Sequence, residues 1–306
     1  MFSPKWQPIV PSYFEHVTKT WKYIIPWPQS KYSAKIDPVL DFDPANTAIS
    51  TTSADMLLSG IAEDGYIVQR ILETHAHADH ITAAQYLKTQ LRKKQKAASQ
   101  ACIGKGITSR NSFDCTFTDG ETFSIGKLEA RVLHLPGHTP DHVGSLIGEN
   151  VFCGDSILNP DIASARTDFP QGSANILGQS VRKLLSLHRH FRLYTGHVYP
   201  PADRIQDGDQ GGLQGQPRPF AAIEEHRHVN RHVKDGTSEE DFVRWRQERD
   251  ASLGSPRLLH HSLQFNIRAG KPPRPSLDGT VLLRMPLKIP ETAFSRESVF
   301  ITHPLN

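Results

Sequence analysis

Hydrophobic and polar residues recur along the chain at two spacings, the alternation typical of strands and the spacing typical of helices. These two patterns predict most of the secondary structure. Alternation typical of strands occurs near the N-terminus, over Tyr13–Val17, Trp21–Ile25 and Ala34–Asp37. The following stretch 37–46, DPVLDFDPAN, indicates a loop because prolines and aspartates interrupt it. From Ser53 the apolar residues recur at helical spacing, and Gly65 is a typical helix stop. The sequence therefore opens with strands, a loop and one amphipathic helix.

A second strand-to-helix unit contains an unusual concentration of histidines. The stretch 66–73, YIVQRILE, predicts a strand that ends just before His75. Beyond Asp79 a helical face is predicted from the spacing of Ile81, Ala84, Leu87 and Leu91. The segment THAHADH thus occupies a turn between a strand and a helix, where functional sites in α/β proteins are common.

The central part of the chain is rich in strand patterns. Hairpins are predicted to turn at Gly126 and at 148–150, and the stretch 191–197, FRLYTGH, indicates a further core strand. Between them an amphipathic helix is predicted from Leu177, Val181, Leu184 and Leu185. Strands that alternate with helices and hairpins favour an α/β sandwich.

The C-terminal third differs in composition. A Gly/Gln-rich connector covers 206–219, and helices are predicted near 219–233 and 238–252. Thr237 and Glu240 have the spacing of a capping box for the second helix. We therefore expect a catalytic core over residues 1–205 and, over 206–306, a connector with a helical extension packed on that core.

Composition restricts the function classes. The 306 residues are 37% hydrophobic and 22% charged, with a formal net charge of +3, which is too weakly basic to indicate nucleic-acid binding. Three scattered cysteines predict neither a disulfide framework nor a zinc knuckle. The sequence contains no apolar run long enough for a membrane helix and no signal-peptide pattern at its start. The cytoplasm is the expected compartment, with the mitochondrion as the alternative.

Candidate metal ligands occur in four separate stretches. The first, THAHADH, contributes the side chains of His75, His77, Asp79 and His80. The other three stretches are LPGHT, FCGDS and YTGH, and they contribute His138, Asp155 and His197. Each of these three residues comes after a short strand and a glycine, so its side chain is expected at a sheet edge. Imidazoles and carboxylates are the usual ligands of zinc, iron and manganese.

Taken in this order, the four stretches resemble the metallo-β-lactamase superfamily. The resemblance implies an αββα sandwich with its metals at one edge of the two sheets. It assigns one metal to His75, His77 and His138, a second to Asp79, His80 and His197, and makes Asp155 a ligand shared by both.

The superfamily contains zinc hydrolases and iron oxygenases, so the fold alone does not choose the chemistry. ILETHAHADHITAAQYL, ARTDFPQGSA at 165–174 and the C-terminal HSLQFNIRAGKPPRP closely resemble the persulfide dioxygenases. That resemblance implies one iron(II) per chain, bound by His75, His138 and Asp155. The substrates would be O2 and glutathione persulfide, and the products sulfite and glutathione.

The same resemblance implies roles for the remaining site residues. Reacting groups and ligands would be oriented through hydrogen bonds by His77, Asp79, His80 and His197. Arg166 is expected to be an electrostatic clamp, either on the substrate or on Asp168, with a purely structural salt bridge as the alternative. Members of this family often form homodimers.

Two other functions stay open on the sequence. A hydrolase of a thioester, lactone or lactam would use two zinc ions and all seven ligands, and a metal-binding or anion-binding protein without turnover is a third reading. Val198 stands where relatives of the persulfide dioxygenases usually have aspartate, and the segment 104–118 is short. Both departures concern the surroundings of the pocket rather than the candidate ligands.

Overall fold

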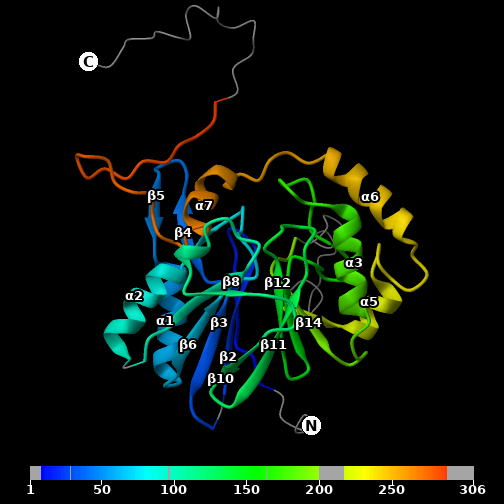
Figure 1. Cartoon of the computed structure of the whole chain (residues 1–306), viewed down its shortest axis with the longest axis horizontal. Coiled ribbons are helices and arrows are strands. Elements are labelled where there is room, and N and C mark those ends of the chain that lie inside the picture. Colours follow the sequence, from blue (N-terminus) through cyan, green and yellow to red (C-terminus); the bar gives the residue numbers. More distant parts are fainter. Residues whose placement is uncertain (1–7, 28, 96, 163, 200–216, 288–306) are drawn as a thin grey trace, which may run out of the picture.

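The computed structural model describes residues 8–27, 29–95, 97–162, 164–199 and 217–287. Two six-stranded sheets face each other, with helices on both outer sides (Figure 1). This is the αββα arrangement that the sequence predicted. Within the described ranges, every helix is too short or too polar to span a bilayer.

The first sheet is mixed. Its strand order is β1 (Ser12–Glu15), β2 (Thr20–Pro26), β3 (Tyr32–Ile36), β6 (Ile67–Leu72), β8 (Gln100–Gly104) and β9 (Cys115–Phe117). The β1–β2–β3 part is antiparallel, and β3, β6, β8 and β9 are parallel. The carboxyl ends of β6 and β8 therefore reach the same edge, where the histidine loop begins.

The second sheet is antiparallel except for one pair. Its order is β10 (Thr122–Ile125), β11 (Leu128–His134), β12 (Val143–Ile147), β13 (Asn150–Gly154), β14 (Arg192–Thr195) and β15 (Phe220–Ala222). Strands β13 and β14 are parallel, so both end at the edge that carries the metal-binding residues. The two predicted hairpins, β10–β11 and β12–β13, are confirmed.

Helices cover both outer faces. The first sheet carries α1 (Thr52–Glu63) and α2 (Ala84–Lys94), and the second carries α3 (Ala174–Leu185), α5 (Ile223–Val229) and α6 (Glu239–Ala251). Leu57 and Leu87 pack on the first sheet, while Leu177 and Phe242 pack on the second. Aromatic side chains such as Tyr23 and Phe152 fill the layer between the sheets.

Four details differ from the sequence prediction. The predicted loop contains β4 (Val39–Asp43), which pairs with β5 (Ala48–Ser50) and with β7 (Ile81–Thr82) in a small third sheet. Because β7 pairs with β4, helix α2 begins later than predicted. The predicted helix at 219–233 is a short strand followed by α5, and α6 is capped by Ser238 instead of Thr237.

The extension contacts both halves of the sandwich. Phe242 of α6 packs in the same cluster as α3, and Phe265 of α7 (Leu259–Asn266) packs with α1 and α2. Most of the predicted connector, residues 206–216, lies outside the described residues. The described part of the extension therefore shares its hydrophobic packing with the core.

Candidate metal centre

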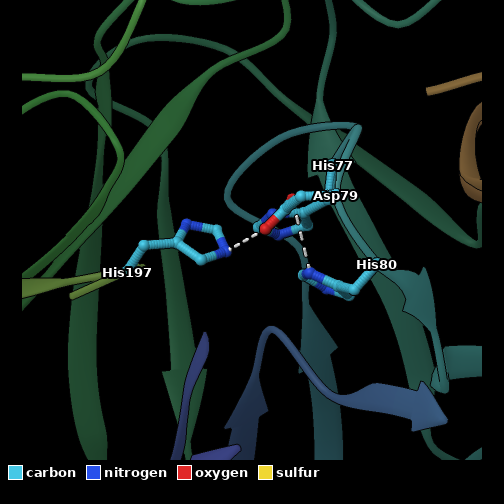
Figure 2. A group of neighbouring side chains, drawn as sticks. All are labelled: His77, Asp79, His80 and His197. Carbon is cyan, nitrogen blue, oxygen red and sulfur yellow. Dashed lines mark ion pairs between the residues drawn. The ribbon is translucent and has the colours of Figure 1, made fainter. Parts of the chain in front are cut away.

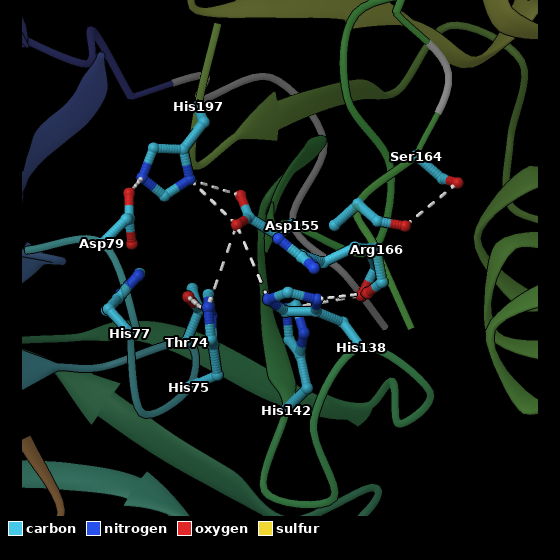
Figure 3. A network of polar contacts seen from close by, with 12 residues as sticks. Thr74, His75, His77, Asp79, His138, His142, Asp155, Ser164, Arg166 and His197 are labelled. Atoms are coloured by element: carbon cyan, nitrogen blue, oxygen red, sulfur yellow. Dashed lines mark hydrogen bonds and ion pairs between the residues drawn. The ribbon is translucent and has the colours of Figure 1, made fainter. Parts of the chain in front are cut away.

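Loops from both sheets bring the candidate ligands together at one edge of the sandwich. The histidine loop follows β6, His138 lies between β11 and β12, and Asp155 and His197 follow β13 and β14. Figure 3 shows these side chains converging from opposite sheets. Seven residues from four separate stretches of the sequence therefore form one cluster.

Three of them gather their ligand atoms around a single point. The Nε2 atom of His75 lies 3.9 Å from Asp155 Oδ2, and that of His138 lies 3.8 Å from the same oxygen. One ligand atom from each of these residues lies within 4.8 Å of the other two. These separations exceed a hydrogen bond. Two ligands of one ion, each about 2.1 Å from it at a tetrahedral angle, would lie about 3.4 Å apart. The trio therefore has the chemistry and nearly the spacing of a metal site.

The rings of His75 and His138 are held through their other nitrogens. Thr74 donates its hydroxyl hydrogen to Asp37 Oδ2 (2.9 Å), so its oxygen can only accept from His75 Nδ1 (3.0 Å). The backbone carbonyl of Arg166 accepts from His138 Nδ1 at 2.6 Å. Each Nδ1 therefore carries the hydrogen, and each Nε2 keeps the lone pair that a metal requires.

A second group contains His77, Asp79, His80 and His197 (Figure 2). His197 lies between two carboxylates: its Nε2 is 2.5 Å from Asp79 Oδ2 and its Nδ1 is 2.7 Å from Asp155 Oδ1. Asp155 therefore contacts both groups. His77 is placed in this second group rather than with His75 and His138, because its Nε2 faces Asp37 Oδ1 at 3.1 Å.

Charge distinguishes His75 and His138 from His197. Burial and the neighbouring His77 and His142 hold the pKa of His75 well below its usual value, and burial also lowers the pKa of His138. Burial alone would lower the pKa of His197, but Asp155 and Asp79 outweigh it and hold that pKa well above its usual value. His75 and His138 are thus neutral near pH 7, whereas His197 is an imidazolium between two carboxylates.

Unpaired buried nitrogens show that the cluster fits a metal. His80 Nε2 and His77 Nδ1 make no hydrogen bond with any described residue, although both side chains are wholly buried. Isolated buried polar atoms are costly, and coordination would satisfy them. The donor set of imidazoles and carboxylates suits iron or zinc. The protein thus has a His/Asp metal-binding cluster.

A cavity of about 840 Å³ opens onto the cluster. His138, Asp155 and Asp79 lie in its wall, and the far wall comes from the extension. The cationic side chains that line it are Lys19, Arg166, Arg231, Arg246, Arg249 and Arg257. The cavity is therefore suited to a substrate that carries negative charge.

Arg166 is already bound within the protein. Its Nε and Nη2 donate to the two carboxylate oxygens of Asp168 at 2.6 and 2.5 Å, and its Nη1 donates to the Gly254 carbonyl at 2.8 Å. Asp168 itself is not among the residues that line the cavity. The structure shows the Arg166–Asp168 contact, and because Arg166 also lines the cavity, its contact with a substrate stays a prediction.

Several residues around the site were not singled out from the sequence. Asp37 accepts hydrogen bonds from the backbone and hydroxyl of Thr74, and Asn266 of α7 donates to the carbonyls of His77 and His80 at 2.7 Å. Asp37 follows β3, so its place at a strand end was the one signal available. Asn266 had none, because its role depends on a contact 186 residues away in the chain.

A further loop contact links α6 to a ligand. Asp250 Oδ2 accepts from the backbone and hydroxyl of Thr167, and Arg246 donates to the Ser164 carbonyl. These bonds fix the loop whose Arg166 carbonyl holds His138. Val198, in contrast, is buried in the core between the sheets.

Comparisons with known proteins identify the class. No family model matches the chain. It is 38% identical over 278 residues to Glyoxylase B2 of Dictyostelium discoideum, covering 85% of this chain and 90% of that protein. It is 36% identical over 303 residues to the Beta-lactamase hydrolase-like protein of Xylella fastidiosa (strain 9a5c), covering 94% of this chain but only 66% of that longer protein.

Solved structures show the same architecture. The crystal structure of ETHE1 from Myxococcus xanthus aligns with a TM-score of 0.69 at 27% identity, over 86% of this chain and all of that one. A metallo-β-lactamase from Staphylococcus aureus has a TM-score of 0.66 at 16% identity, over 89% of this chain and 76% of that one, a likeness of fold. The chain belongs to the metallo-β-lactamase superfamily.

Within that superfamily the chain also resembles a persulfide dioxygenase. It is 30% identical over 189 residues to the human mitochondrial persulfide dioxygenase ETHE1, covering 61% of this chain and 66% of that protein. The family resemblance found in the sequence is confirmed at this level.

Proposed function

We propose that the protein is an iron(II)-dependent persulfide dioxygenase that acts on a small anionic thiol persulfide such as glutathione persulfide. The balanced reaction consumes one persulfide, one O2 and one water, and releases one thiol, one sulfite and two protons. The observation that carries this proposal is the convergence of His75, His138 and Asp155 on one point beside the cavity. Two histidines and one carboxylate are the ligand set of many non-haem iron(II) oxygenases.

Iron(II) bound there by His75, His138 and Asp155 would supply open coordination positions for a soft sulfur anion and for O2. The protein supplies the geometry. Thr74 and the Arg166 carbonyl orient the two imidazoles, and His197 donates to the Asp155 carboxylate. Asp79 in turn accepts from the other side of His197. We assign Asp79, His80 and His197 the role of orienting the reacting groups.

The cavity supports an anionic substrate. Glutathione carries two carboxylates and one ammonium group, so its persulfide is a net anion. Arg249 and Arg257, both in the C-terminal extension, line the cavity, and both residues are exposed. Arginine binds carboxylates through paired hydrogen bonds. We therefore assign substrate carboxylates to Arg249 and Arg257, and a structural role to the Arg166–Asp168 pair.

A zinc-dependent hydrolase of a thioester, lactone or lactam is the second candidate. The observation that favours it is the second group, His77, Asp79, His80 and His197, which could hold a second metal. Two of the similar proteins, Glyoxylase B2 and a Hydroxyacylglutathione hydrolase, also bear names that fit this class. A metal that lowers the pKa of its bound water would supply the nucleophile for that reaction.

Metal analysis combined with product analysis separates the two functions. The protein is purified anaerobically, its iron and zinc are counted, and glutathione persulfide and a glutathione thioester are offered to it in parallel. The dioxygenase predicts about one iron per chain and sulfite formation. Two zinc ions with thioester hydrolysis and no sulfite would refute it.

Asp155→Ala provides the residue test. This variant should lose metal and sulfite formation together, because the carboxylate contacts both ligand histidines and His197. Asp119→Ala is the matched control, since this carboxylate is exposed, binds only Lys183 and the His134 backbone N–H among the described residues, and lies outside the cavity. It should retain both metal and activity.

A further inference from the structure

Cys102 and Cys115 are register partners on the parallel strands β8 and β9. Neighbouring strands lie about 4.7–4.9 Å apart, which falls within the Cα separations of about 4.4–6.8 Å found in disulfides. Residues in register point to the same face of a sheet, and both cysteines pack in the core between the two sheets. Their sulfur atoms are therefore on the same side and close enough to be bridged.

The two thiols differ in exposure. Cys102 is fully buried, whereas Cys115 is half-buried on β9, the last strand in the described order of its sheet. Arg70 lies beside them, with its Nη1 3.8 Å from Cys102 Sγ. A disulfide reagent from solvent can therefore reach Cys115, whereas Cys102 is not accessible to it.

The two thiols also differ in pKa. A hydrogen bond from Cys102 and, to a smaller extent, the charge of Arg70 together lower the pKa of Cys115 to about 7, against the opposing effect of burial. The same hydrogen bond raises the pKa of Cys102, and burial raises it further. A thiol whose pKa lies near the ambient pH is the most effective attacking group in thiol–disulfide exchange.

We propose that Cys102 and Cys115 form a redox-active dithiol that a low-molecular-weight disulfide converts into an intrachain disulfide. The Cys115 thiolate attacks one sulfur of the reagent, forms a mixed disulfide and releases one thiolate. Cys102 then attacks the Cys115 sulfur, loses its proton and displaces the second thiol. The protein loses two protons and two electrons, and the reagent is reduced to two thiols.

This pair lies one strand away from the metal-binding cluster. The Cys102 carbonyl accepts the backbone N–H of Glu73, which immediately precedes the Thr74–His75 pair. The proposal nevertheless does not depend on the reaction at the cluster, and its test measures thiols instead of turnover. Cys153 is wholly buried on β13 and its pKa is raised by burial, so it serves as the internal control.

The test treats the whole protein anaerobically with oxidised glutathione, followed by intact mass and peptide mapping of alkylated and oxidised cysteines. The wild-type protein should lose two free thiols, link Cys102 to Cys115 and retain no glutathione. Cys102→Ser should keep one glutathione on Cys115, because the resolving thiol is gone. Cys115→Ser should remain unmodified, and Cys153→Ser should behave as the wild-type protein.

Three results would overturn the proposal. They are a wild-type protein that retains glutathione on Cys115 while Cys102 stays free, a Cys115→Ser variant that reacts as fast as the wild type, and a disulfide that joins two chains.

Discussion

The loop that orients His138 depends on a buried ion pair at the end of α6, so Asp250→Ala should weaken both stability and metal binding. Asp250 accepts from the Thr167 backbone at 2.8 Å and hydroxyl at 2.7 Å, and its other oxygen binds Arg246 at 2.7 Å. Asp250 is 7% exposed and Arg246 only 3%. Breaking a buried ion pair by removing one partner costs about 3–5 kcal/mol of unfolding free energy. This figure includes the loss of the two hydrogen bonds from Thr167.

The loss of stability is measured by urea denaturation, and metal affinity by competition with a chelator. Because the loop carries the Arg166 carbonyl that holds His138, we expect metal affinity to fall about 10–100-fold, as it does when groups behind a ligand are removed. Asp250→Asn keeps an acceptor for Thr167 and should lie between the wild type and the alanine variant.

Asp241→Ala on the same helix is the matched control. This carboxylate pairs with Arg244 in solvent, with side chains 61% and 64% exposed, and accepts the Ser238 hydroxyl at 2.7 Å, so the change should cost no more than about 1 kcal/mol. The reasoning is refuted if Asp250→Ala costs no more than the control and binds metal as tightly as the wild type.

Three further predictions concern the cavity, a buried lysine and a helix cap. Arg257→Ala should raise KM about tenfold with little change in kcat, since a charge-assisted contact made equally in the ground and transition states is lost; steady-state oxygen uptake measures this, and an unchanged KM would remove Arg257 from the substrate site. Lys35 is wholly buried and makes no hydrogen bond with its Nζ to any described residue, and burial holds its pKa well below 10.5. The unfolded chain therefore binds more protons between that lowered pKa and 10.5, and stability rises with pH across this window. Lys35→Met should remove that slope and stabilise the protein near pH 7 by at least about 1 kcal/mol, as urea midpoints at several pH values would show; an unaltered slope would mean that Lys35 is charged in the folded state. Ser238→Ala should cost about 1 kcal/mol because its hydroxyl caps α6, whereas Thr237→Ala should be nearly neutral by the same assay, and equal effects would contradict the cap assignment.

Short-range patterns predicted the strands, the helices and an α/β sandwich, and the resemblance to the metallo-β-lactamase superfamily implied that the candidate ligands meet at one edge of the two sheets. Each candidate ligand follows a strand whose hydrophobic period is clear, so its position at a sheet edge could be inferred. Four segments that meet at one edge then sufficed to place seven ligands together.

Elements that depend on long-range pairing could not be predicted in the same way. Strand β4 lies between prolines and aspartates; its second half pairs locally with β5, and its first two residues, Val39 and Leu40, pair with the distant Thr82 and Ile81. The same pairing delays the start of α2. In both cases a contact about forty residues away in the chain overrides the local signal.

Contacts made by the C-terminal extension could not be predicted from the sequence for a related reason. Arg246 and Asp250 have the spacing of an ordinary exposed pair on a helix, and only the contacts with Ser164 and Thr167 make them buried. The placement of His77 beside Asp37 likewise follows from the geometry of two strand ends and not from the HAHADH motif.

Oxygen uptake by the anaerobically purified, iron-containing protein on addition of glutathione persulfide tests the central claim most directly. The account predicts one O2 consumed and one sulfite formed per persulfide, with both lost in Asp155→Ala and retained in Asp119→Ala. An iron-containing protein that consumes no oxygen, or a zinc-containing protein that hydrolyses a glutathione thioester instead, would contradict it.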